Sequence, residues 1–109
     1  MTTTKPIKKF NLLLLESSYI DKNILKESLK SFFAKIVSID IDINFIKIFK
    51  SENFDIILSG SDRLDDIEKL KEINPNIEII IIGSKNSDEL LKAVNINVYK
   101  YLTLPLNLN

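Results

Sequence analysis

The sequence predicts an α/β fold built on one doubly wound, parallel five-stranded sheet with strand order 2-1-3-4-5. Its 109 residues are enough for one compact domain, and 45% of them are hydrophobic. From Phe10 onward, five short apolar runs alternate with polar stretches of helical periodicity, which is typical of βα units. Two of these runs are apolar throughout, as expected of strands that are buried on both faces of a parallel sheet.

The chain begins with residues 1–9, which lack periodicity and are predicted to be a disordered lead-in to a domain spanning 10–109. The first strand is NLLLLE, residues 11–16, whose uniformly apolar character favours a central position. The first helix is expected over 19–35, where apolar residues recur at helical spacing. Ser17 or Ser18 is predicted to cap it, a role favoured over anion binding at the same helix end.

The next four elements follow the same alternation. KIVSIDI, residues 35–41, alternates in polarity and is predicted to be an edge strand, and residues 44–53 form a short helix. FDIILS, residues 54–59, is the third strand. The helix at 65–73 should end before Asn74-Pro75, because proline stops helical geometry.

The last elements are a central fourth strand at 77–83, a helix at 84–96 and a fifth strand at 98–105, stopped by Pro105. Only four residues remain after that, so the helix that would complete a fifth βα unit is expected to be missing. Its absence would leave apolar side chains of strands one, three and five uncovered on one side of the sheet. Such a patch predicts self-association, a partner domain or a fragment of a longer protein.

Composition excludes several classes of function. The chain has no Cys and no His, which removes thiolate nucleophiles, CxxC pairs, zinc sites and imidazole catalysis. Fifteen basic and fifteen acidic residues balance, so direct nucleic-acid binding is not expected. No apolar run reaches the ~18 residues of a membrane span. The expected location is the cytoplasm, without membrane contact.

Right-handed crossovers in this strand order place any site at the carboxyl ends of strands one, three and four. Three segments there carry a family pattern: FDIILSG, PNIEIIIIGS and YKYLTLP. With them the chain resembles the receiver domain of bacterial two-component response regulators, over residues 9–107. The resemblance implies a flavodoxin-like fold and a role in phosphorelay signalling.

The same resemblance assigns the family's site positions to residues of this chain. The acidic pair falls on Glu16 and Ser17, and the phosphoacceptor on Gly60. The hydroxyl position falls on Gly83, with Ser84 one place late. The lysine position falls on Leu104, followed by the retained Pro105, and the aromatic switch position falls on Tyr101.

The residues at these positions lack the groups that four chemical roles of the family's site require. Gly60 offers no carboxylate nucleophile, and Leu104 offers no donor to a bound phosphoryl group. Glu16 beside Ser17 is at most a weak Mg²⁺ site, so no cofactor is expected. The chain is therefore predicted to be a degenerate receiver: a binding module and not an enzyme, with a protein partner or output domain, or a second copy in a homodimer.

Alternatives remain open at three places. Asp62, with Glu16, could serve as a displaced acceptor in an active receiver, whereas Asp55 lies at the wrong end of its strand. Gly60 and Gly83, the only glycines, are interpreted as supplying unusual φ angles or tight turns in preference to a ligand hollow.

The predicted partner surface is the edge formed by the fourth helix and fifth strand, residues 87–104. It includes Tyr99, Lys100 and Tyr101. Tyr99 and Tyr101 alternate along the strand, so one of them is expected to point outward.

Overall fold

The computed structural model describes residues 10–18, 21–40, 44–83 and 87–103, and these form one parallel five-stranded sheet with four α-helices. The strand order is β2-β1-β3-β4-β5, and every neighbouring pair is parallel, as the alternation of elements predicted. The strands are β1 (Asn11–Leu15), β2 (Lys35–Ile39), β3 (Ile56–Gly60), β4 (Glu78–Gly83) and β5 (Lys100–Thr103).

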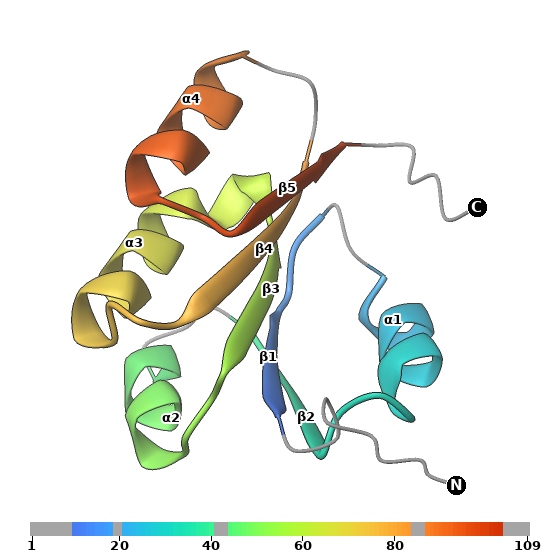
Figure 1. Ribbon diagram of the computed structural model, residues 1–109. Helices are drawn as coiled ribbons and strands as arrows, with labels where there is room; N and C mark the ends of the chain where they lie inside the picture. The colour runs from blue at the N-terminus through green and yellow to red at the C-terminus, as the bar shows by residue number, and fades with distance from the viewer. Residues whose placement is uncertain (1–9, 19–20, 41–43, 84–86, 104–109) are drawn as a thin grey trace, which may run out of the picture.

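The helices are distributed unequally over the two faces of this sheet (Figure 1). They are α1 (Lys22–Leu29), α2 (Phe45–Ser51), α3 (Leu64–Ile73) and α4 (Ser87–Ile96), with a 3₁₀ turn, η2 (Ser61–Arg63), before α3. Three of them, α2, α3 and α4, cover one face, and α1 lies alone on the other (Figure 1). No helix follows β5 within the described residues, which end at Thr103.

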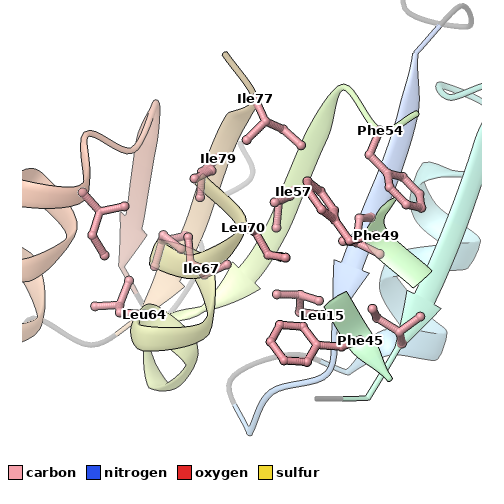
Figure 2. Packing of buried hydrophobic residues seen from close by; sticks show 14 of the residues in the cluster. Leu15, Phe45, Phe49, Phe54, Ile57, Leu64, Ile67, Leu70, Ile77 and Ile79 are labelled. Carbon is pink, nitrogen blue, oxygen red and sulfur yellow. The ribbon is translucent and has the colours of Figure 1, made fainter. Parts of the chain in front are cut away.

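The main hydrophobic core lies between the sheet and the three-helix layer. Alternate strand residues such as Leu13, Ile57 and Ile79 point into it and are fully buried. Figure 2 shows Ile57 and Ile79 packed against Ile67 and Leu70 of α3. The other alternate residues, among them Leu12, Leu58 and Ile82, point to the α1 side, so β1, β3 and β4 have apolar side chains on both faces.

The first helix is shorter than the sequence predicted, and its cap is different. It begins after Asp21, whose carboxylate accepts hydrogen bonds from the backbone N–H groups of Asn23 and Ile24, both at 3.1 Å. The prediction that Ser17 or Ser18 caps this helix is wrong, because Asp21 supplies the cap and both hydroxyls donate elsewhere. The helix ends at Leu29, and the N–H of Phe32 bonds back to the Leu29 carbonyl in a tighter turn.

Other boundaries differ less. The second strand ends at Ile39, and residue 41, the last of its predicted extent, lies outside the described residues. The predicted lead-in 1–9 also lies outside them. The fifth strand covers Lys100–Thr103, so its predicted stop at Pro105 is not described either.

The face that carries α1 is only partly covered. Residues of β1, β3, β4 and β5 line an apolar groove beside α1, with a cavity volume of about 230 Å³. The sequence predicted uncovered apolar side chains on strands one, three and five, but for β1 and most of β3 this is wrong, because Leu12, Leu14 and Leu58 are at most 7% exposed. The groove is lined where Ile56, Ile80 and Leu102 are only partly buried.

Candidate functional site

The position above Gly60 is filled by side chains of this chain. Gly60 ends β3 at the carboxyl edge of the sheet and has φ −84° and ψ 161°, which any residue can adopt. A Cβ added there would collide with the Oγ of Ser17 and lie 2.8 Å from the Ser17 Cβ and 2.7 Å from Asp62 Oδ1. Glycine is therefore required by crowding. The predicted explanation from an unusual φ is wrong, since neither glycine has a positive φ.

Asp62 bridges β3 to the segment that follows β1. Its Oδ1 accepts a hydrogen bond of 2.5 Å from the Ser17 hydroxyl, and its Oδ2 accepts one of 2.9 Å from the Ser18 hydroxyl. The backbone N–H of Ser18 also donates to Oδ2, at 3.2 Å. The carboxylate reaches back because β3 runs directly into η2, where Asp62 is the second residue. The serines predicted to cap α1 thus hold this carboxylate in place.

These hydrogen bonds set the pKa of Asp62. Partial burial alone would raise it, but the donors Ser17 and Ser18 outweigh burial and hold the pKa of the Asp62 carboxyl below its ordinary value. A carboxyl with a depressed pKa in the folded state stabilises the fold above its ordinary pKa of about 3.9. That contribution is lost as the pH falls through the lower, folded-state value.

We therefore expect Asp62→Asn to lower the free energy of unfolding at pH 7, and the difference from the wild type to shrink below about pH 4. Urea denaturation from pH 7 down to pH 3 measures this difference. Ser17→Ala keeps the carboxylate but removes one donor, and it should show a smaller pH-dependent difference. A difference that stays constant with pH would show that the ionised form is not preferentially stabilised.

Glu16, the one acid retained from the predicted pair, is engaged in an ion pair. Its carboxylate pairs with the ammonium group of Lys22 in the first turn of α1. This hydrogen bond is the main cause that lowers the pKa of Glu16, and it raises the pKa of Lys22. The Nε of Arg63 donates to the Glu16 carbonyl at 3.0 Å. The end of β1 is thus tied to both η2 and α1.

The position above Gly83, at the end of β4, is filled in the same way. A Cβ there would collide with the Ser61 hydroxyl and lie 2.5 Å from the Ser61 Cβ and 2.6 Å from the Tyr101 hydroxyl oxygen. Ser61 is buried, and its hydroxyl donates to the carboxylate of Glu89 on α4. Residues from η2, β5 and α4 therefore converge on Gly83.

The proposed partner residues divide between the inside and the outside. Tyr101 is half-buried and packs against the main core, whereas Tyr99 is 68% exposed. Tyr99 lies before β5, which begins at Lys100, so its exposure does not come from alternation along that strand. Lys100 is exposed and lies beside Ile80, on the α1 side of the sheet.

Several residues that the sequence analysis considered for the site lie outside it or outside the described residues. Ser84, Leu104 and Pro105 lie outside the described residues. Asp55 is at the opposite edge of the sheet from Gly60, where its carboxylate accepts a 2.8 Å hydrogen bond from the N–H of Asn11. Sequence reasoning missed Ser61 and Glu89, which are brought together by packing between η2 and α4 and have no shared motif.

At the strand ends, the Asp62 carboxylate is held by Ser17 and Ser18, and the Ser61 hydroxyl is bonded to Glu89. Within the described part of the chain, no three acidic, Cys or His side chains are placed so that they could hold a metal ion. The same residues contain no helix long and apolar enough to cross a membrane.

Comparison with solved structures identifies the fold. The signal receiver domain of an HD domain-containing protein from Pseudomonas fluorescens Pf-5 superposes with a TM-score of 0.78 at 18% identity, covering 91% of this chain and 85% of that one. The fold is that of a response-regulator receiver domain. No protein-family model matches the sequence, and no curated protein matches it significantly.

Two further receiver structures are informative. A response regulator from Burkholderia pseudomallei with a phosphorylated aspartic acid has a TM-score of 0.72 at 18% identity over 91% of this chain, which spans 62% of that regulator's length. The receiver domain of Ssk1 from Saccharomyces cerevisiae, crystallised with the phosphotransfer protein Ypd1, has a TM-score of 0.68 at 19% identity, covering 94% of this chain and 83% of that one. At these identities the likeness concerns the receiver fold alone.

Proposed function

We propose that this chain is a degenerate receiver module of a two-component system that is not phosphorylated and acts by binding proteins. The observation that carries the proposal is the filled space above Gly60. A phosphoacceptor needs a carboxylate at the end of β3, and this chain has neither the side chain nor the room for one. The proposal includes no enzymatic activity, no cofactor and a cytoplasmic location.

One observation favours a second candidate, an active receiver that uses Asp62. An oxygen of Asp62 lies 2.7 Å from the point where a Cβ of residue 60 would be, so a carboxylate does occupy the acceptor's neighbourhood. Both of its oxygens accept hydrogen bonds from Ser17 or Ser18, however, and Glu16 is paired with Lys22. A nucleophile held by donors on both oxygens is weakened, and Mg²⁺ would have to displace Lys22 from Glu16.

Intact mass measurement separates the two candidates. We expect no phosphoryl mass gain when the protein is incubated with Mg²⁺ and acetyl phosphate, because Asp62 is held by Ser17 and Ser18 and Glu16 is paired with Lys22. Asp62→Asn serves as the matched variant. A stable gain of one phosphoryl group in the wild type that is lost in Asp62→Asn would overturn the proposal and establish Asp62 as the acceptor.

The surface that the structure offers for binding lies on α4 and just beyond it. The described residues include eight large hydrophobic side chains that are exposed, and four of them fall between residues 90 and 99. They are Leu90, Leu91, Val94 and Tyr99. Hydrophobic side chains gathered on one surface mark an interaction site more often than scattered ones do. The binding surface we propose is therefore centred on α4, with Tyr99 at its edge, and Tyr101 lies beneath it.

A further inference from the structure

The chain has an apolar ridge on α4 and an apolar groove on the opposite face of the sheet, and we propose that the ridge of one copy docks into the groove of the next. The copies then associate head to tail. This inference deepens the proposed function, because it rests on α4 as the binding surface and names a second copy of this chain as the partner.

The groove has the width of one helix. Its lining side chains come from α1 and the turn after it, and from β1, β3, β4 and β5: Leu12, Leu25, Leu29, Phe33, Ile56, Leu58, Ile80, Ile82 and Leu102. The distance across the sheet from β1, which lies beneath α1, to β5 is three strand spacings, or about 14 Å. An α-helix with its side chains is about 10–12 Å across. A second helix therefore fits beside α1, over the partly buried side chains of Ile56, Ile80 and Leu102.

The ridge consists of Leu90, Leu91 and Val94, which lie within one and a half turns on the outer side of α4. Leu91 is 61% exposed and Val94 is 62% exposed, whereas Ala93 and Ile96 on the inner side are buried. Helix α4 is thus apolar on two sides, although only one of them contacts its own sheet. A helix that is apolar on two sides is expected to be covered on both.

Electrostatics permit the contact between copies. No charged side chain lines the groove, and the whole chain has a formal net charge of zero, so copies do not repel one another at long range. Asp88 lies one turn before Leu91 on α4, and Lys100 is exposed at the β5 edge of the groove. Asp88 and Lys92 both flank the ridge, so its margin carries no excess of either charge.

A symmetric dimer through the groove face is disfavoured by α1. Its outer side carries polar residues, including Glu27 and Lys30, which form an exposed ion pair. If two copies packed face to face, this pair would be pressed against the partner's apolar groove and lose its hydration without compensation. Docking of α4 leaves Glu27 and Lys30 in solvent. Because ridge and groove are different surfaces, the contact is heterologous and can repeat.

Complementation between two variants tests this arrangement. Leu91→Glu with Val94→Glu removes the ridge, and Leu102→Glu places a charge in the groove. By light scattering from micromolar to millimolar concentration, we expect the mass of the wild type to rise with concentration and each variant to remain monomeric. An equimolar mixture should form a dimer and stop there, because one intact ridge meets one intact groove. In that mixed dimer the ridge and the groove that are still unoccupied are the two altered ones, so a third copy cannot bind.

The control is Ile73→Glu, which charges a hydrophobic residue on α3 that is 39% exposed and lies outside both surfaces. It should associate like the wild type. Circular dichroism verifies folding, and Leu102→Thr replaces Leu102→Glu if the charge unfolds the chain. A monomeric wild type, a symmetric dimer, or a variant mixture that stays monomeric would each overturn the inference. None of these results bears on phosphorylation, so the failure of this inference is distinguishable from that of the proposed function.

Discussion

Gly60→Ala should lower the free energy of unfolding by about 2–4 kcal/mol, although alanine adopts the Gly60 backbone angles without strain. In an uncrowded position the same substitution would stabilise the chain by about 0.4–1 kcal/mol, because it restricts the unfolded state. Here the new methyl group meets Ser17 Oγ, which could rotate, and Ser17 Cβ, which cannot move without the backbone. The segment after β1 must shift, and Ser17 loses its hydrogen bond to Asp62. Urea denaturation measures the loss.

A double-mutant cycle isolates the cause. Ser17→Gly removes both of the Ser17 atoms that crowd the methyl group, so Gly60→Ala should cost at least about 1 kcal/mol less in that background. Ser18→Gly is the matched control: it removes a hydroxyl that also bonds to Asp62, but no Ser18 atom is among the nearest neighbours of the added Cβ. Equal costs of Gly60→Ala in all three backgrounds would show that crowding by Ser17 is not the reason for glycine.

The crowding bears on how this receiver fold could regain an acceptor. Gly60→Asp alone would place a second carboxylate against Asp62 and a Cβ against Ser17, so it adds repulsion to overlap. Restoring the acceptor position therefore requires simultaneous changes at residues 17, 60 and 62. Substitution of Gly60 alone therefore does not make room for a carboxylate side chain at this position.

The fold could be predicted from the sequence because each signal for it is local. Apolar runs such as 11–15 and 79–82 can only be central strands in a chain that alternates strands and helices, and strand order follows from their burial. The cap of α1 was mispredicted because three residues that can cap, at 17, 18 and 21, occur within five positions. The choice among them depended on Asp62, which is more than forty residues away in the sequence.

Spacing in the sequence located the positions of the candidate site, but it did not predict which side chains fill the space above them. The identity of Gly60 indicates that no nucleophile is present, yet it does not say whether the space is open or filled. Occupation of that space by Ser17 and Asp62 is a tertiary contact between β1 and η2. The same holds for Gly83, where Ser61 and Tyr101 converge from two other elements. Sequence could predict the edge of the sheet where the site lies, and only packing could show that its acceptor and hydroxyl positions are filled.

Gly83→Ala should also cost about 2–4 kcal/mol of unfolding free energy, for the same physical reason at the neighbouring strand. Its added methyl group would overlap the hydroxyl and Cβ of Ser61 and the hydroxyl oxygen of Tyr101. Ser61 is buried and donates to Glu89, so its displacement also breaks the link from η2 to α4. Tyr101 is half-buried and can withdraw its hydroxyl more easily.

The two neighbours should therefore rescue Gly83→Ala to different extents. Ser61→Gly removes both overlapping atoms of residue 61 and should recover more of the lost stability than Tyr101→Phe, which removes one oxygen. Tyr99→Phe is the control, because it deletes a tyrosine hydroxyl from an exposed residue outside this cluster. Greater rescue by Tyr101→Phe would mean that most of the lost stability comes from overlap with the tyrosine hydroxyl and not from overlap with η2. In that case Tyr101, beneath the α4 surface, would be the element that couples the filled site to partner binding.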